Sequence, residues 1–364
     1  MIKVLRVADG FTTTGRHFLK TGLAITAAPL LGAADLENEK RIAHNGENIM
    51  TDLLKNKKVL ITLDGSKRSL QTAAYACRLR ALQRMEINLF HVLDAIPDNF
   101  WDIKLRGQPI GCRTNLRAWE AERKKLIRIY MDRAEDIFLS YGFNAGKIKV
   151  TIQQRKMGIA RDIVRELNQG YDLLITRRRG MGAIRSLVVG SVTAKLLEKV
   201  QSIPVILAGQ EPYRQKFLVA VDGSENANRA LDFVSAFLQG SGCKIRLVHV
   251  VRGGGTDVYT GDLPMPLTFP ESFMQEALEE STMILNNAKQ QLLAGRFEEQ
   301  DIECKTITGV LSRAVAIADE ARENRFSTIV IGRKGLSCIS EFSMGRVTKK
   351  IVYMARRESV WIIP

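Results

Sequence analysis

Two stretches rich in glycine contain the residues best suited to hold a ligand. The first reads "RRRGMGAIRSLVVGS", from Arg177 to Ser191, and contains Gly180 and the pair Gly190-Ser191. Glycine lets the backbone approach a ligand closely, and a helix that starts at such a loop presents N–H groups and a positive dipole end to a phosphate. Because arginines accompany these glycines, the stretch alone allows three interpretations: a nucleotide site, a damaged nucleotide site or a basic surface.

The second stretch reads "GRKGLSCISEFSMGR" and runs from Gly332 to Arg346, with Gly335 and Gly345 inside it. Its two inner glycines follow those of the first stretch at a constant distance of 155 residues. A fixed offset of this kind indicates a repeated structural unit. We therefore expect two related ligand sites in one chain.

The repeat extends well beyond the glycines. Asp64 matches Asp222, 158 residues later, because "VLITLDGS" aligns with "FLVAVDGS". Val92 matches Val250 at the same offset, because "LFHVLD" aligns with "LVHVVR". The sequence predicts a leader or poorly structured segment at 1–55, domain 1 at 56–208, a linker that acts as a hinge at 209–215 and domain 2 at 216–364.

The amino terminus has the layout of an export signal, with a basic start and a short apolar run from Thr21 to Ala34. That run is too short to span a membrane. A rival start lies at Met50, which leads directly into the first strand. We interpret the segment as a dispensable or mis-started leader and expect a cytoplasmic protein, with export as the alternative.

Each domain alternates strands with amphipathic helices. The first strands are near-continuous apolar runs, as expected for strands covered on both faces of a parallel sheet, and Ser66 and Ser224 follow them at helix-cap positions. The expected strands are 59–63, one ending near 92, 148–152, 173–176 and 203–207, then 217–221, one ending near 250, 304–308, 328–331 and 360–363. The fold class is α/β, with two doubly wound, Rossmann-like, five-stranded parallel sheets in tandem.

Ligands of such sheets lie beyond the carboxyl ends of the strands, where the strand order reverses. Asp64 and Asp222 follow the first strands, and Val92 and Val250 end the second strands. The glycine stretches follow the fourth strands and lead into a final helix that starts at Ser191 or Arg346. These residues should therefore meet at one edge of each sheet.

With these residues in place, the chain resembles the universal stress protein family in tandem form. The resemblance implies an adenine-nucleotide alpha-hydrolase-like fold and a pattern of Gly, two residues, Gly, nine residues, Gly and then Ser or Thr. It further implies that the glycine loop and hydroxyl hold ribose and phosphates, while the Asp and Val lie at the adenosine end. Neither domain matches fully, because Arg177 replaces the first glycine of domain 1 and Arg346 replaces the hydroxyl residue of domain 2.

The resemblance implies a stress-response protein that binds ATP or a related adenine nucleotide in a regulatory role. We expect the better site in domain 2, because Arg346 keeps the backbone N–H groups and adds a charge-assisted donor. The alternative is a nucleotide-free scaffold that acts through protein–protein contacts. The expected nucleotide-binding residues are Asp222, Val250, Gly332, Gly335, Gly345 and Arg346, with Asp64, Val92, Gly180, Gly190 and Ser191 in domain 1.

Composition restricts the remaining options. The net charge of +15 favours acidic partners, but aromatic residues are not interleaved with the basic ones, which argues against nucleic acid. The five cysteines are scattered without C-x-x-C spacing, so they predict small buried side chains rather than a zinc site or disulfides. We interpret His91 and His249 as packing residues and the Arg177–Arg179 run as a solvated loop.

No nucleophile, metal cluster or acid–base pair can be assembled from the sequence. We therefore expect no enzyme, with weak ATP hydrolysis as the one enzymatic option left open. The ending "VWIIP" is typical of an edge strand that needs a partner. The last strands of the two domains should pair as an intramolecular pseudo-dimer, and a further homodimer stays open.

Overall fold

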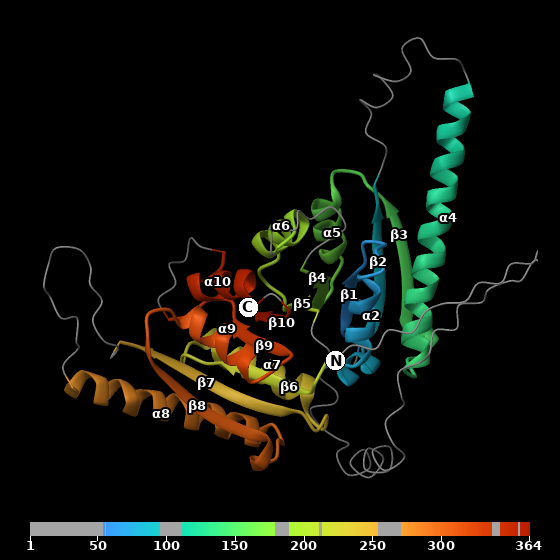
Figure 1. The fold of residues 1–364 in the computed structure, drawn as a ribbon. Coiled ribbons are helices and arrows are strands. Elements are labelled where there is room, and N and C mark those ends of the chain that lie inside the picture. Colours follow the sequence, from blue (N-terminus) through green and yellow to red (C-terminus); the bar gives the residue numbers. More distant parts are fainter. Residues whose placement is uncertain are drawn as a thin grey trace, which may run out of the picture. The chain divides into compact units, whose positions relative to one another are not determined.

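A computed structural model describes Leu54 and residues 56–94, 111–178, 189–210, 213–253, 271–336, 343–355 and 357–364, with side chains of α4 from residue 118 (Figure 1). All of these residues fall within one compact unit. Apart from Leu54, the expected leader lies outside the described residues, as do Gly180 and part of each glycine stretch.

The elements alternate as the sequence predicts. The first half contains β1 (Lys58–Thr62), α2 (Leu70–Cys77), β2 (Glu86–Leu93), α4 (Gly111–Ser140), β3 (Ile148–Gln154), α5 (Ile159–Leu167), β4 (Leu173–Arg177), α6 (Ser191–Lys199) and β5 (Val205–Ala208). The second half contains β6 (Lys216–Ala220), α7 (Glu225–Leu238), β7 (Lys244–Arg252), α8 (Glu271–Ala294), β8 (Ile302–Val310), α9 (Arg313–Glu323), β9 (Thr328–Gly332), α10 (Arg346–Met354) and β10 (Ser359–Ile363).

The strands form one continuous ten-stranded sheet rather than two separate ones. Its order is β3-β2-β1-β4-β5-β10-β9-β6-β7-β8, and every neighbouring pair is parallel except β5 and β10. These two strands pair antiparallel, with Trp361 opposite Ile206. The predicted pairing of the last strands is therefore confirmed, and it places the two halves about a pseudo-twofold axis.

Helices cover both faces of the sheet, which produces two hydrophobic layers. Side chains from α2, α4, α7 and α8 form one layer, and side chains from α5, α6, α9 and α10 form the other (Figure 1). The central strands are buried on both sides, as their continuous apolar sequences predict. The α/β doubly wound class is confirmed.

Two arginines tie the halves together next to the central pairing. Arg178 donates to the backbone oxygen of Glu358 at 2.6 Å, and Arg333 donates to the backbone oxygen of Leu197. Both side chains are buried, at 4% and 2% exposure. Burial lowers the pKa of Arg333 to about 10. Expecting a solvated loop here was wrong for Arg178, because a charged donor buried at a sheet junction satisfies carbonyls that strand pairing leaves open.

The predicted linker is packed against both halves where the structure describes it. Gly209 N donates to Ser359 Oγ at 3.0 Å, and the ring of Tyr213 makes edge-on contacts with Tyr75 and Phe217. Tyr75 in turn accepts a hydrogen bond of 2.8 Å from the indole of the fully buried Trp361. These contacts cross the repeat boundary and join the described part of this segment to both halves.

The cysteines partly follow the prediction. Cys77 and Cys243 are buried free thiols, and burial raises their pKa to about 12 and about 11. Cys304 is exposed, so the expectation of a buried side chain was wrong there. The reason is its position on β8, which is an edge strand of the sheet. Cys112 and Cys338 lie outside the described side chains.

Candidate functional site

In the second half, the chain turns sharply where β6 ends. Gly223 has a φ of +73°, which glycine adopts without strain. That turn lets Ser224 N donate to Asp222 Oδ1 at 3.1 Å, while Ser224 Oγ caps α7 by accepting from Ala227 N at 3.2 Å. The predicted cap at Ser224 is confirmed, and it fixes the Asp222 carboxylate at the carboxyl end of the sheet.

The glycine stretch of the second half packs onto this carboxylate. A Cβ on Gly335 would overlap Asp222 Oδ2, so only glycine allows the observed approach. Gly345 lies next to it, because its own Cβ would come within 3.6 Å of Gly335 N. The fold therefore brings Asp222 together with Gly335 and Gly345, which lie more than a hundred positions later in the chain.

The helix after this stretch starts where the sequence predicts. Gly345 is the N-cap of α10 and Arg346 is its first residue, with an exposed side chain. In the first half, Gly190 and Ser191 hold the same two positions at the start of α6. Backbone N–H groups in a first helical turn have no partner within the helix, so both starts can bind an anion.

Val92 and Val250 are buried near the ends of β2 and β7. The backbone oxygen of Val250 accepts a hydrogen bond of 3.1 Å from Nε of Arg313. Arg313 is the first residue of α9, and its pKa is lowered by burial and by Arg252, against the opposing charge of Asp222. The sequence analysis missed Arg313; its place at the start of the helix after the third strand was the signal that could have found it.

The first half differs at the corresponding turn. Ser66 N donates to Asp64 Oδ1 at 2.9 Å, as in the second half, but α2 begins only at Leu70. By the repeat, α7 begins at the equivalent of Lys67. The predicted cap at Ser66 was therefore wrong: its hydroxyl accepts from Ser69 N at 3.1 Å in a turn that precedes the helix.

Arg177 explains this delay. It occupies the position of Gly332, because each accepts a hydrogen bond of 2.8 Å from a threonine one helix later, Thr193 or Thr348. A Cβ on Gly332 would lie 2.9 Å from the backbone of Asn226, in the first turn of α7. From the equivalence of the two positions we infer that the Cβ of Arg177 takes this room in the first half and excludes a first helical turn like that of α7.

The two histidines have structural roles, as interpreted from the sequence. His91 Nδ1 lies 2.7 Å from the backbone oxygen of Leu63, and His249 Nδ1 lies 2.8 Å from that of Val221. Burial lowers the pKa of His91, the bond to Leu63 and the charge of Asp64 oppose this shift, and Arg123 adds to it. Each ring thus holds the end of a first strand against its neighbour.

The lowered pKa of His91 predicts a loss of stability in acid. The unfolded chain takes up a proton near the ordinary pKa of about 6.5, whereas the folded ring takes it up only at lower pH. Stability is therefore full above this value and falls as the pH drops below it. Urea unfolding between about pH 7.5 and 5 measures this effect. The free energy of unfolding should fall less steeply with decreasing pH in His91→Asn than in the wild type, by up to about 1.4 kcal/mol per pH unit.

His249→Asn removes the equivalent hydrogen bond in the second half and serves as the control for that bond alone. If the wild type and His91→Asn lose stability in parallel over this range, His91 is not the group responsible.

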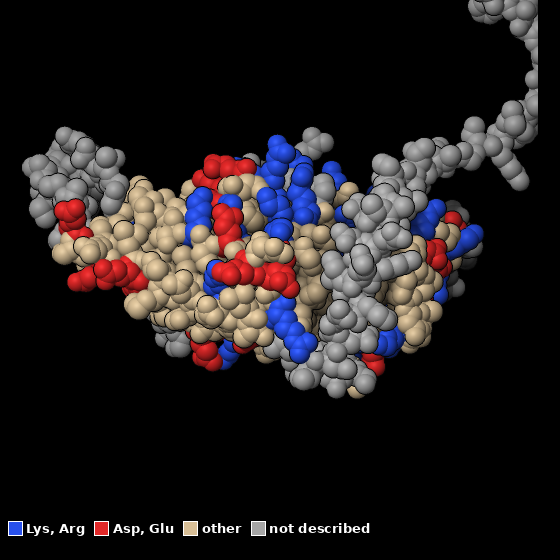
Figure 2. All heavy atoms as spheres, turned by 90° about the horizontal axis from the view of Figure 1, so that it is seen from below, with Lys and Arg blue, Asp and Glu red and all other residues tan. Residues whose placement is uncertain are grey.

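Charges of both signs are mixed on one face of the described surface. On the face in Figure 2, Lys and Arg lie among Asp and Glu and uncharged surface, rather than in one basic stripe. Within the ranges that the structure describes, no group of three potential metal ligands occurs. Over the same ranges, no helix combines the length and the apolar character needed to cross a bilayer.

Comparison with known proteins decides the family. The model of the universal stress protein family matches residues 55–208 and again 214–364. The chain belongs to the universal stress protein family. Universal stress protein YxiE of Bacillus subtilis (strain 168) is 30% identical over 138 residues, which are 37% of this chain and 90% of that protein.

A solved structure supports the fold of this tandem universal stress protein. The crystal structure of a universal stress protein from Archaeoglobus fulgidus DSM 4304 superposes with a TM-score of 0.53 and 15% identity. The match covers 84% of this chain and 97% of that one. At this identity the likeness concerns the fold alone, so the roles of the site residues remain predictions.

Proposed function

We propose that this universal stress protein binds ATP or a related adenine nucleotide in its second half and acts as a regulator of a stress response. The observation that carries the proposal is the packing of Gly335 onto the carboxylate of Asp222, which creates a tight corner of backbone and carboxylate at the carboxyl end of the sheet. A ribose needs such a corner, since its hydroxyls donate to a carboxylate while the chain approaches closely.

The other predicted residues complete this arrangement. Gly332 admits the first turn of α7, and Gly345 opens α10, whose N–H groups suit a phosphate. Arg346 supplies an exposed guanidinium at the same helix start in place of the hydroxyl. We assign Val250 to the base end, where Nε of Arg313 donates to the backbone oxygen of Val250 and the Arg313 charge interacts with that of Asp222.

The first half is the weaker candidate. Arg177 stands in place of the first glycine, and the delayed start of α2 removes the turn that Ser224 caps in the second half. Asp64, Val92, Gly190 and Ser191 keep their positions around this altered turn. We propose that this half supports the second one rather than binding nucleotide itself.

Arg333 gives the bound nucleotide a route to the other half. Its backbone oxygen accepts from Gly345 N at 2.9 Å, and its Nε donates to Ser343 O at 2.7 Å. The same guanidinium donates to Leu197 of the first half. Binding of phosphates at the start of α10 would therefore bias the junction between the halves, which is the regulatory step that we propose.

A scaffold without nucleotide is the second candidate, and the bond from Arg313 to Val250 favours it. In that case the guanidinium blocks the base end permanently. The two functions differ in the wild-type protein: the scaffold retains no ATP because Arg313 fills the base end, whereas a nucleotide site retains ATP and changes its affinity in Arg313→Ala.

Equilibrium dialysis with labelled ATP tests the proposed function. We expect retention of one nucleotide per chain, and mass spectrometry of the denatured, freshly purified protein should detect an adenine nucleotide. Hydrogen exchange near Leu197 should slow when ATP is added, because Arg333 joins the glycine stretch to that backbone. No retention at high protein concentration, together with no co-purified nucleotide, would sink the proposal in favour of the scaffold.

A further inference from the structure

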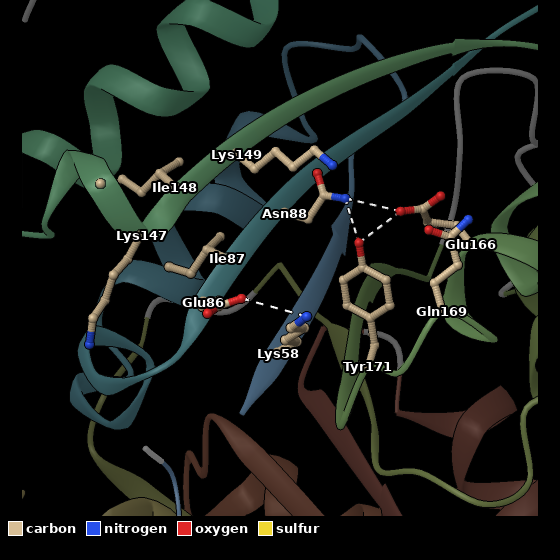
Figure 3. A pocket seen from close by; sticks show the side chains of 11 residues that line it. Lys58, Glu86, Ile87, Asn88, Lys147, Ile148, Lys149, Glu166, Gln169 and Tyr171 are labelled. Atoms are coloured by element: carbon tan, nitrogen blue, oxygen red, sulfur yellow. Dashed lines mark hydrogen bonds and ion pairs between the residues drawn. The ribbon is translucent and has the colours of Figure 1, made fainter. Parts of the chain in front are cut away.

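A hollow lies at the edge of the sheet opposite to the glycine stretches. It has a volume of about 270 Å³ and lies where β1, β2 and β3 begin, under the end of α5 (Figure 3). Pockets for drug-sized ligands measure roughly 300–1,000 Å³, so this one suits a small molecule. Its polar lining comes from Asn88, Glu166, Tyr171, Lys147 and Lys149.

Three of these side chains form a closed network. Asn88 Nδ2 donates to Tyr171 OH at 2.6 Å and to Glu166 Oε1 at 3.3 Å, and Tyr171 OH donates to the same Oε1 at 2.8 Å. Burial raises the pKa of Tyr171 to about 12, the bond from Asn88 opposes this shift, and Glu166 adds to it. Tyr171 thus stays a neutral donor at physiological pH.

The network leaves polar groups without partners. The atom of Asn88 that faces the carboxylate must be the amide nitrogen, so its Oδ1 faces away from Glu166, toward the side of Lys149 (Figure 3). That oxygen is buried, and no donor among the described residues reaches it. Glu166 is only 8% exposed and pairs with no cation in the described part of the chain. Buried carboxylates are normally paired with a charge.

The internal repeat shows what fits in this place. Arg246 takes the register position of Asn88, since each lies opposite an apolar residue of the first strand and a charged residue of the third. Its guanidinium binds Glu303 at 2.7 Å, binds Glu320, and lies 5.0 Å above the ring of Phe326. Glu320 and Phe326 correspond to Glu166 and Tyr171. The guanidinium of Arg246 therefore occupies in the second half the space that is open beside Asn88 in the first half.

One position differs in a way that defines the rest of the ligand. The residue opposite Arg246 is Glu303, whereas the residue opposite Asn88 is Lys149, which is exposed. Lys147 lies two residues earlier, and its Nζ donates to the backbone oxygen of Arg84 at 3.2 Å. The remaining lining charges, Lys58 and Glu86, pair with each other at 3.8 Å. A ligand here therefore meets the buried carboxylate of Glu166 and the exposed ammonium group of Lys149 (Figure 3).

We propose that this hollow binds a small zwitterion with a guanidinium at one end and a carboxylate at the other, of which free arginine is the simplest example. The guanidinium takes the place that Arg246 holds in the second half, against Glu166 and Asn88 Oδ1. The carboxylate lies toward Lys149. The site is separate from the nucleotide site, which lies at the carboxyl ends of the strands.

Calorimetric titration of the full chain with L-arginine tests this site. We expect saturable binding, at least about tenfold weaker binding of agmatine, which lacks the carboxylate, and none of citrulline, which lacks the positive charge. Added ATP should leave the arginine affinity unchanged, so a failure of either site is seen independently of the other.

Variants separate the site from general charge effects. Glu166→Gln should weaken arginine binding at least about tenfold, whereas Glu323→Gln, which removes the same charge from an exposed position of α9, should leave it unchanged. Asn88→Arg should abolish binding without loss of thermal stability, because it fills the hollow as Arg246 does. Lys149→Glu should reverse the preference from arginine to agmatine.

Two results would overturn the proposal. One is that no heat of binding is detected with arginine at up to about 10 mM, a concentration above the dissociation constant of even weak specific binding. The other is arginine binding that Glu166→Gln and Asn88→Arg leave intact, since both variants change groups that the ligand must contact.

Discussion

Replacing Gly335 with valine is expected to weaken ATP binding at least about tenfold, equivalent to about 1.4 kcal/mol. Even a single Cβ at this position overlaps Asp222 Oδ2, so the carboxylate must turn away from the site. That movement also breaks the bond from Ser224 N to Asp222, which shapes the turn after β6. Equilibrium dialysis with labelled ATP measures the change directly.

The same variant should remain folded. The atom that the new side chain meets is the end of a side chain rather than backbone, and Gly335 has no positive φ. We expect a change of less than about 1 kcal/mol in the free energy of unfolding. Asp222→Ala should reproduce the loss of affinity, and Asp64→Ala, the matched change in the first half, should not. Unchanged ATP affinity in Gly335→Val would place the nucleotide elsewhere in the chain.

Gly209→Ala is expected to lower the free energy of unfolding strongly, although it adds only one methyl group. Its Cβ would lie 2.5 Å from the backbone oxygen of Glu358 and closer still to that of Arg357. Both carbonyls are fixed, since Gln210 N donates to Arg357 O at 2.6 Å and Arg178 donates to Glu358 O. Backbone cannot move aside as a side chain can, so we expect about 2–3 kcal/mol of destabilisation.

Urea unfolding and hydrogen exchange at β5 and β10 measure this effect. Gly240→Ala is the control, because its Cβ meets no atom within 4 Å although a φ of +68° costs about 1 kcal/mol. The loss in Gly209→Ala should exceed the control and should appear first as faster exchange in the two paired strands. Equal stability of the two variants would mean that the junction tolerates displacement of residues 357–358.

Local patterns predicted most of the fold. The apolar runs that become β1 and β6, and the cap at Ser224 that starts α7, depend on neighbouring residues alone. The repeat predicted the equivalence of the halves, and the ending of the chain predicted the β5–β10 pairing. The observed strand ends differ from the predicted ones by one or two residues, because the last residues of a strand pair or do not pair according to its neighbours in the sheet.

The candidate site was predicted less completely. Asp222, Gly335 and Gly345 meet as expected, since the carboxyl ends of parallel strands share one edge of the sheet. The cap at Ser66 was wrong, because the obstacle is the Cβ of Arg177, which lies more than a hundred residues later in the chain. Arg313 was missed for a related reason: its partner is a backbone oxygen on a distant strand, and no sequence motif marks that acceptor.

The sequence by itself determined that this protein is a tandem repeat of one α/β unit with glycine stretches after the fourth strands. Only the tertiary structure decided that Arg178 and Arg333 cross between the halves, and that Asn88 leaves open the room that Arg246 fills. The physical reason is that strand and helix formation follow from local periodicity and caps. The partner of a buried charged side chain, in contrast, depends on which carbonyl or carboxylate of a remote segment lies within hydrogen-bonding distance.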